Sequence, residues 1–496
     1  MQPHFRSPCA FNLLCATLLV TPVTLYAALP NGVSTGDVTT DTAVLWARTT
    51  AIGALEFTVL EVDRQVRVIE HTSISVGDSD VPAKITLRGL RPGTHYAYQV
   101  KDAEGARRFA TFRTADAPGS SRGLRFGASG DWRGELAPYP AIANAWRRRL
   151  DFFVKLGDTI YADVPSPAVN KPQAESLTEF RRKHAEGYTT RFGLNTWTPL
   201  QAVTPIYALI DDHEVTNDFA GGAPAASDPR FGTATGLINE TTLYRRGIQA
   251  FTEYNAIEAR HYPVIGDART DGRPDLYRAQ RFGDVAALFM LDARSFRDQD
   301  LPPVQNPLDP AQIGLFLARA FDPTRTMLSQ RQLQQFLTDM LAAHQSGVKW
   351  KFVFVPEPIQ NLGVIGASDR FEGYAAERTT NLKFIDEHQI SNVVFISADI
   401  HGTLVNNLNY QLSPQHPPVA TRAFEITTGS VAYDAPFGPT VLRIAAAIPV
   451  APGVSLLDVF LQTTGTPTLE AFNALPEPIK NIALEALHRR YDLQPG

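Results

Sequence analysis

The sequence has few cysteines and no excess of basic residues, and these absences exclude several classes of protein. Only two of its 496 residues are cysteine, Cys9 and Cys15, so the chain beyond residue 15 can form no disulfide. The formal net charge of −5 leaves no basic footprint for nucleic acid and no attraction to anionic lipid. With 44% apolar and 20% charged residues, the composition is that of an ordinary globular protein with ample core.

The first 27 residues have the pattern of a secretory signal peptide. Arg6 gives a positive start, Phe11–Val20 is an apolar core, and Ala27 is a small residue suited to cleavage. The apolar core is too short for a membrane anchor, which needs about 20 residues, and no comparable run follows. We therefore expect export to the periplasm or the medium, with no integral membrane segment after signal cleavage.

The length predicts two domains after the signal. Residues 29–117 contain short alternating runs separated by turn residues, of which Thr42–Thr49 is the clearest, so an all-β sandwich is expected there. The segment before Tyr96 has the order of a tyrosine corner, and the whole region resembles a fibronectin-III-like sandwich. It is either a packed support for the next domain or a carbohydrate- or surface-binding module. The turn-rich Asp116–Ser121 is the expected linker.

Residues 120–496 alternate between strand-like and helix-like patterns, which predicts an α/β catalytic domain. Leu124–Ser129, a helix over Tyr139–Leu150 and Phe152–Leu156 form a predicted βαβ unit with parallel strands. The remaining expected strands are Ile206–Ile210, Asp284–Leu291, Trp350–Val355, Val393–Ser397 and Ala423–Thr428. The remaining expected helices lie within 173–200, Asn239–Glu253, Ser329–His344, 452–462 and 468–490. The loop over 297–326 is long enough to be a lid or a wall of the site.

Carboxylates directly follow four of these strands. The segments are Gly130-Asp131, Gly157-Asp158-Thr159-Ile160-Tyr161, Asp211-Asp212-His213-Glu214 and Ala398-Asp399-Ile400-His401. Carboxylates at the ends of successive strands meet at one edge of a sheet, where open α/β proteins build their sites. Hard oxygen ligands gathered there with imidazole and one phenol favour bound metal over acid–base catalysis alone.

The residue types within the first two segments suggest individual roles. Asp158 is predicted to bridge two cations, because a carboxylate can give one oxygen to each. Tyr161 as a phenolate would suit a trivalent iron, since such a cation lowers the pKa of a phenol. Asp131 ends the preceding strand of the same βαβ unit, so it should lie close to Asp158 and serve as a further ligand.

The last two segments add ligands and a candidate acid. Asp399 and His401 are two residues apart, so on an extended segment they would share one side and reach neighbouring metals. Asp212 is predicted to be a ligand, and His213 the group that protonates the leaving oxygen. Two weaker candidates for metal binding complete the set, namely Asn217 and Glu357.

In this order, the four segments resemble those of the calcineurin-like metallophosphoesterases. Within that superfamily the chain is most similar to the PhoD-type alkaline phosphatases, through "LGDTIYAD", "DDHEVTND", "LDARSFRD" and "SADIHG". Purple acid phosphatases also have a leading β-domain and a Gly-Asp-x-x-Tyr segment, but they place Asn where Asp212 lies. The resemblance implies a metallophosphoesterase α/β/β/α sandwich preceded by the all-β domain. PhoD-type members often carry Cys near the position of Asp131, so the identity of the metals stays open.

The resemblance implies an exported phosphatase that hydrolyses phosphate monoesters, diesters or both by metal-bound hydroxide. Two or more metal ions are expected, Fe³⁺ with Ca²⁺, Mn²⁺ or Zn²⁺. Hydroxide would attack phosphorus in line while His213 assists the leaving alkoxide. Three arginines before the Asp211 segment are candidates for binding phosphate oxygens, although a solvated helix face is the simpler interpretation for at least two of them. They are Arg181, Arg182 and Arg191.

Two alternatives stay open at this point. A phospholipase D-like phosphodiesterase would keep the fold and change the ester. A non-catalytic adhesion or carbohydrate-binding protein would use the aspartates for structural Ca²⁺. Calcium prefers oxygen ligands and has little use for imidazole, so His213 and His401, together with Tyr161, argue against the second alternative.

Overall fold

The computed structural model describes residues 29–62, 67–232, 235–306, 309–364 and 367–433, and in addition 446, 449–451, 453–455 and 457–458. The predicted signal peptide and the predicted helix over 468–490 lie outside the described residues, as does much of the predicted helix over 452–462. Within the described ranges, no helix is both long and apolar enough to cross a bilayer.

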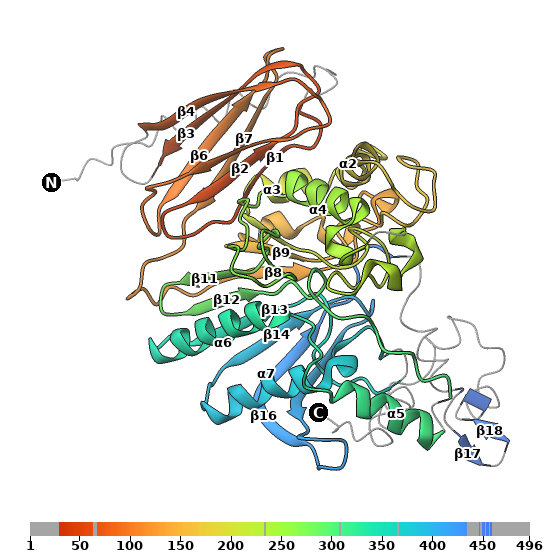
Figure 1. Ribbon diagram of the computed structural model, residues 1–496. Helices are drawn as coiled ribbons and strands as arrows, with labels where there is room; N and C mark the ends of the chain where they lie inside the picture. The colour runs from red at the N-terminus through yellow and green to blue at the C-terminus, as the bar shows by residue number, and fades with distance from the viewer. Residues whose placement is uncertain are drawn as a thin grey trace.

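Two antiparallel sheets form an N-terminal sandwich, drawn in red and orange in Figure 1. Alternate residues of its strands are buried, as in β6, because successive side chains of a strand point to opposite faces. The Tyr96 hydroxyl accepts a hydrogen bond from the Arg91 backbone N–H at 2.8 Å, so the predicted tyrosine corner is present. One sheet has β1 Val33–Gly36, β2 Ala43–Ala47 and β5 Ala83–Leu87, and the other has β4 Arg67–Val76, β3 Gly53–Glu61, β6 His95–Lys101 and β7 Arg107–Arg113.

The rest of the described chain is built on two further sheets. The smaller is parallel, in the order β10-β9-β8, with β8 Phe126–Ser129, β9 Phe152–Leu156 and β10 Ile206–Leu209. The larger has the order β11-β12-β13-β14-β16-β15, in which the four inner strands are parallel and the two outer strands antiparallel to their neighbours. Its strands are β11 Arg278–Phe282, β12 Ala286–Met290, β13 Trp350–Phe354, β14 Val393–Ser397, β15 Leu404–Tyr410 and β16 Val419–Thr427.

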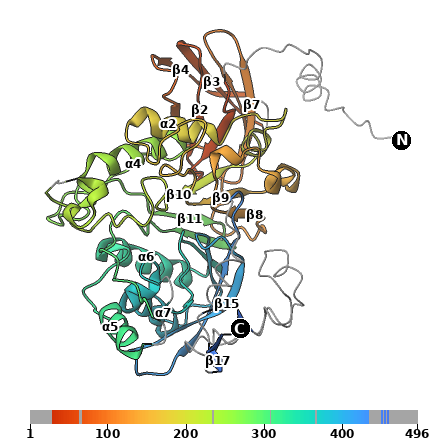
Figure 2. The same ribbon diagram turned by 90° about the vertical axis from the view of Figure 1, so that its right-hand side faces the viewer.

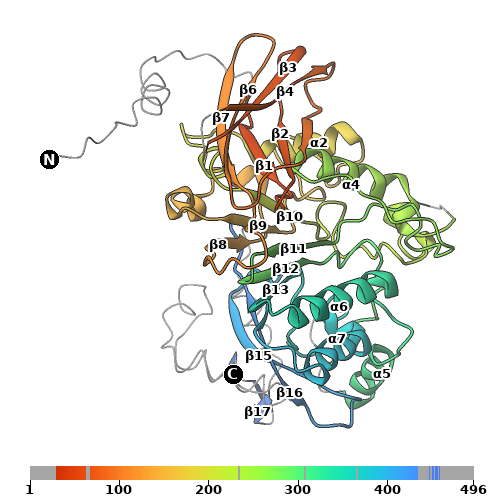
Figure 3. The same cartoon turned by 90° about the vertical axis from the view of Figure 1, so that its left-hand side faces the viewer.

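These two sheets share one apolar core, to which Phe152 and Leu156 of the small sheet and Met290 and Ile396 of the large sheet contribute. Helices α6 Ser329–Gln345 and α7 Ala375–Glu387 cover the outer face of the large sheet (Figure 2). Figure 3 shows the small sheet between the sandwich and the large sheet. Three helices lie on the side of the small sheet, namely α2 Leu177–Glu186, α3 Trp197–Gln201 and α4 Thr242–Tyr254. The predicted α/β/β/α arrangement behind an all-β domain is confirmed.

Three local predictions were wrong. The segment predicted as a helix over Tyr139–Leu150 forms two 3₁₀ turns, Pro140–Ile142 and Ala145–Arg148, because proline starts it and a left-handed Arg149 ends it. The predicted helix within 173–200 is two helices, α2 and α3. The predicted loop over 297–326 contains helix α5, Pro310–Ala320, which begins with proline behind an Asp309 cap that accepts from the Ala311 N–H at 2.9 Å.

The sandwich docks on the two-sheet part of the chain through buried side chains. The Trp46 indole donates to the Glu253 carbonyl at 2.8 Å, and the Tyr207 hydroxyl donates to the Val38 carbonyl at 2.6 Å. Trp46 is 1% exposed, so burial of this large ring contributes to the packing as well as the hydrogen bond. The sandwich is therefore fixed on the edge of the small sheet.

Candidate metal centre

The candidate ligands lie at the carboxyl ends of strands in a backbone conformation that few residues other than glycine adopt. Asp131, Asp158 and Asp399 follow β8, β9 and β14 and have φ values of 64°, 48° and 65°. Left-handed aspartates turn the chain sharply away from the sheet, and such strained positions concentrate at functional sites. His401 also has a positive φ, 55°. The expectation that Asp399 and His401 share one side of an extended segment was wrong.

Two glycines allow these strand ends to come together. A Cβ on Gly130 would lie 2.6 Å from the Ala398 Cβ, which joins the small sheet to the large sheet at this point. Gly157 has a φ of +90°, and a Cβ there would lie 2.5 Å from the Asp211 Cβ. Each distance is too short for two carbon atoms. The Gly-Asp dipeptides therefore serve backbone approach as well as ligand placement.

The candidate ligand atoms form two groups that share one residue. Asp131, Asp158 and His401 have ligand atoms within 4.8 Å of one another, and so do Asp158, Asp212 and His213. A carboxylate common to two groups is the arrangement expected of a bridge between two cations. The structure thus brings together five of the predicted residues.

The contacts of Asp131 fit a bound cation. Its side chain has no exposure, and neither carboxylate oxygen accepts a hydrogen bond from the described residues, although His401 Nε2 lies 3.4 Å from Oδ1. An isolated buried carboxylate is costly unless it is paired or bound to metal. The donor set of carboxylate, imidazole and phenol suits hard and borderline metal ions.

The pKa values reflect the excess of negative charge. Burial, and then the charge of Asp399, raise the pKa of Asp131 well above its usual range. Burial and Asp212 do the same for Asp158. Burial and Asp369 raise the pKa of Asp399 to about 7. At Asp212 burial acts to raise the pKa, but the charge of Arg294 outweighs it and lowers the pKa. A cation would relieve the repulsion among these groups.

Tyr161 lies within this group. Its hydroxyl donates to Asp158 Oδ2 at 3.0 Å and is 3.4 Å from His401 Nε2. Its ring is 2% exposed and lies 4.2 Å from the ring of His213, centroid to centroid. Burial, followed by the charge of Asp158, raises the pKa of Tyr161 well above its usual range. The phenol is therefore placed where a cation near Asp158 would meet it.

A carboxylate that the sequence analysis missed orients His213. Asp163 Oδ1 lies 2.6 Å from His213 Nδ1, and Asp163 Oδ2 accepts from the Asn217 N–H at 2.7 Å. A carboxylate bound to one ring nitrogen fixes the tautomer and leaves the other nitrogen for chemistry. Burial acts to lower the pKa of His213, but the charges of Asp212 and Asp163 outweigh it and raise the pKa to about 10.

Glu214 joins the two loops that carry Asp158 and His213. One of its carboxylate oxygens accepts from the N–H and the hydroxyl of Thr159, and the other accepts from the Asp211 N–H at 2.9 Å. The side chain is wholly buried. Since these bonds hold the residues next to Asp158 and Asp212, Glu214 is a positioning residue for the site.

Two fully buried arginines lie behind the carboxylates. Arg294 contacts Asp211 at 2.6 Å and Glu357 at 2.8 Å, and it also binds Asp369. Arg297 binds Glu357 at 2.6 Å and Asp369. Arg294 lies two residues after Asp292 in the sequence, but the two side chains do not pair. Instead the guanidinium faces the candidate metal centre, and only its backbone N–H binds Asp292.

The weaker candidates occupy different places. Glu357 is wholly buried with one oxygen between the two arginines and the other without a hydrogen bond in the described part. Asn217 is exposed, and its backbone N–H donates to Asp163 Oδ2 at 2.7 Å. Arg181 is bound by Glu253 at 2.7 Å, and Arg191 by Glu186 at 3.3 Å. These arginines are engaged outside both ligand groups, and Arg182 lies in a separate cleft.

The chain is similar to PhoD-like phosphatases in sequence and in fold. The PhoD-like phosphatase family matches residues 127–450, and the N-terminal domain of PhoD-like phosphatases matches residues 21–116. Alkaline phosphatase D of Bacillus subtilis (strain 168) is 26% identical over 413 residues, which are 76% of this chain. The chain spans 65% of the length of that relative. A solved structure of PhoD superimposes with a TM-score of 0.65 at 21% identity, covering 83% of this chain and 78% of that one, which establishes similarity of fold.

Proposed function

We propose that this chain, which belongs to the PhoD-like phosphatase family, is a metal-dependent hydrolase of phosphate esters. The observation that carries the proposal is Asp131, a carboxylate without exposure or hydrogen bond in the described part, grouped with Asp158 and His401. A buried carboxylate of this kind is costly unless it is protonated, paired or bound to a cation, and a cation fits the three ligand atoms grouped here. The name of the B. subtilis relative, alkaline phosphatase D, supports the same chemical class.

The two ligand groups support binding of two or more metal ions. Asp131, Asp158 and His401, with Tyr161, would hold one ion, and the phenol favours Fe³⁺ there. The second group, with the carboxylates of Asp158 and Asp212, would hold Ca²⁺, Mn²⁺ or Zn²⁺. When bound, such metals lower the pKa of water to give a nucleophile near neutral pH and neutralise phosphate oxygens.

The protein's own residues orient the proton donor. The 2.6 Å contact with Asp163 occupies Nδ1 of His213, so Nε2 is the atom that would donate a proton to the leaving alkoxide. His213 also belongs to a ligand group, so its role as acid must be separated from a role as ligand.

Two substitutions make that separation. Asp158→Asn removes an anionic oxygen shared by both groups, so metal content and activity should fall together. Changes around ligands already reduce metal affinity about 10–100-fold, and the loss here should be larger. His213→Ala should retain metal and lose about 10²–10⁴-fold in turnover, least for esters with good leaving groups. Asp41→Asn, on the exposed surface of the sandwich, is the control.

Metal content by elemental analysis and turnover of p-nitrophenyl phosphate decide the outcome. Loss of metal in His213→Ala with retention in Asp158→Asn would reverse the assigned roles. Wild-type protein without metal would contradict the proposal itself. Parallel assays with a phosphodiester and with phosphatidylcholine separate a monoesterase from a diesterase or a phospholipase D-like enzyme.

We also propose that the protein is exported, on the basis of the pattern of residues 1–27 alone. N-terminal sequencing of protein secreted by an expressing cell should give a start near Ala27 or Ala28. A secreted protein that retains Met1 would contradict cleavage.

A further inference from the structure

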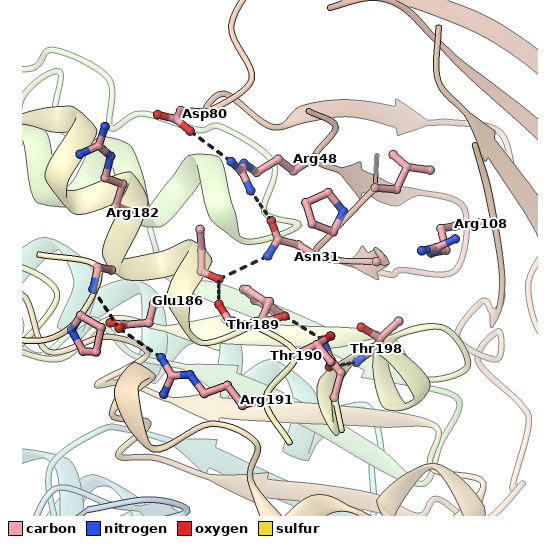
Figure 4. Close-up of a pocket in the computed structure, with 18 of the residues that line it drawn as sticks. Asn31, Arg48, Asp80, Arg108, Arg182, Glu186, Thr189, Thr190, Arg191 and Thr198 are labelled. Atoms are coloured by element: carbon pink, nitrogen blue, oxygen red, sulfur yellow. Dashed lines mark hydrogen bonds and ion pairs between the residues drawn. The ribbon is translucent and has the colours of Figure 1, made fainter. Parts of the chain in front are cut away.

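A cleft lies between the sandwich and the catalytic part, away from the candidate metal centre. Its volume is about 810 Å³, and it is lined by the first described residues, 29–32, by strands of the sandwich, by helix α2 and by the segment 188–199 (Figure 4). None of the residues of the two ligand groups lines it. Cavities of this size hold small organic ligands.

The cleft is basic although the chain is acidic. Four arginines and two carboxylates line it, while the chain as a whole carries −5. The two carboxylates are already paired: Asp80 binds Arg48 at 3.1 Å, and Glu186 binds Arg191 at 3.3 Å. The positive charge that remains belongs to the other two arginines.

These two arginines, Arg108 and Arg182, have no acidic partner among the described residues. Arg108, on β7, donates only to the backbone carbonyl of its neighbour at 3.0 Å. Arg182, on α2, makes no hydrogen bond or ion pair within the described ranges. They come from different domains, and Figure 4 shows them on opposite sides of the view with Arg48 between.

Neutral donors line the floor between the two arginines. Thr189, Thr190, Thr198 and Asn195 are among the lining residues, although the Thr189 hydroxyl donates to the Ala185 carbonyl at 3.5 Å and the Asn195 amide to the Tyr188 carbonyl at 2.7 Å. Thr190 is exposed, and its side chain has no described partner. Guanidinium groups combined with hydroxyls are the donors that proteins use for phosphate oxygens.

We infer that this cleft binds a linear anion carrying two or more phosphate groups, with Arg108 and Arg182 each neutralising a different phosphate. A single phosphate would fill little of the volume and would leave one guanidinium unpaired. Because the two arginines belong to different domains, the ligand would connect the sandwich to the catalytic part. The inference does not depend on the proposed catalytic function.

Calorimetric titration of the full chain with sodium tripolyphosphate tests the inference. Arg108→Ala/Arg182→Ala should bind about tenfold more weakly or worse, since charge-assisted hydrogen bonds are stronger than neutral ones. Arg107→Ala/Arg245→Ala is the matched control, because it removes the same charge from exposed positions that do not line the cleft. Its affinity should stay within about twofold, since distant exposed charges are screened. Thr190→Asp should also weaken binding by placing a negative charge in the cleft.

The metal centre is a second place where a phosphate would bind, so the titrations are repeated with Asp158→Asn. Binding that persists in this variant and is weakened by the cleft substitutions supports a separate site. Equal affinities for the cleft and control variants would overturn the inference, and so would complete loss of binding in Asp158→Asn. Citrate that binds as tightly as tripolyphosphate would overturn the assignment to phosphate. Turnover of p-nitrophenyl phosphate by the wild type tests the proposed function independently of all these outcomes.

Discussion

Replacing Glu214 by glutamine should disturb the candidate metal centre without removing a candidate ligand. The carboxylate accepts three hydrogen bonds, two from Thr159 on one oxygen and one from the Asp211 N–H on the other. A glutamine amide keeps one oxygen and turns an NH₂ group toward the remaining donors. Either orientation therefore leaves a buried N–H facing another N–H.

The magnitude follows from those contacts. A hydrogen bond to a charged group contributes about 1.5–3 kcal/mol, and an unsatisfied buried donor costs about 1–3 kcal/mol. We expect Glu214→Gln to lower the free energy of unfolding by about 3–5 kcal/mol, and to weaken metal binding about 10–100-fold because Thr159 adjoins Asp158.

Glu377→Gln provides a matched control at a distance from the ligands. Glu377 is also buried and also accepts from one threonine hydroxyl and two backbone N–H groups, those of Met327 and Leu328. Both backbone N–H groups bind the same oxygen there, so an amide can keep them and donate to the Thr326 hydroxyl. At pH 8 this control should lose neither stability nor metal.

Scanning calorimetry and metal analysis of both variants at pH 8 give the answer. A Glu214→Gln protein with an unchanged melting temperature and full metal content would refute the reasoning.

Two further predictions concern backbone geometry and pH. Gly157→Ala should cost about 2–5 kcal/mol and reduce metal content, because a left-handed φ is compounded by the clash with Asp211. Gly347→Ala, with a φ of +77° and open space around it, should cost only about 1–2 kcal/mol. Burial raises the pKa of Glu377 from 4.5 to about 7, so its stabilising proton is fully present below about pH 4.5 and is lost as the pH rises through 7. The wild type should therefore lose about 3 kcal/mol relative to Glu377→Gln over that window, measured by urea unfolding, and parallel curves would contradict it.

The parts of the site that sequence predicted are those fixed by strand direction. Asp131 and Asp158 end two parallel strands of one unit, so their proximity follows from topology alone. Asp163 was missed although it stands in the same motif as Asp158, because its partner His213 lies 50 residues away. A signal was available, since a histidine expected to act as an acid needs an orienting carboxylate.

The ion pairs and some of the backbone conformations could not be predicted from the sequence. The contacts of Arg294 with Asp211 and Asp369 join segments 83 and 75 residues apart, and no local pattern specifies such pairings. The segment over Tyr139–Leu150 has helical periodicity, but Pro140 and the packing of Trp132 against Tyr139 and Trp197 override that preference. Tertiary contacts decide the structure at these positions.

The ligand groups draw on both sheets of the catalytic part. Asp131, Asp158 and Asp212 follow strands of the small sheet, whereas His401 follows a strand of the large one. Cations bound there would cross-link two layers that otherwise meet through apolar side chains. In a chain whose cysteines all precede residue 16, the metals would then act as disulfides do in disulfide-bonded proteins. A chelator would speed global unfolding, as a reductant does for disulfide-bonded proteins. Resistance of the protein to proteolysis would then depend on the supply of metal.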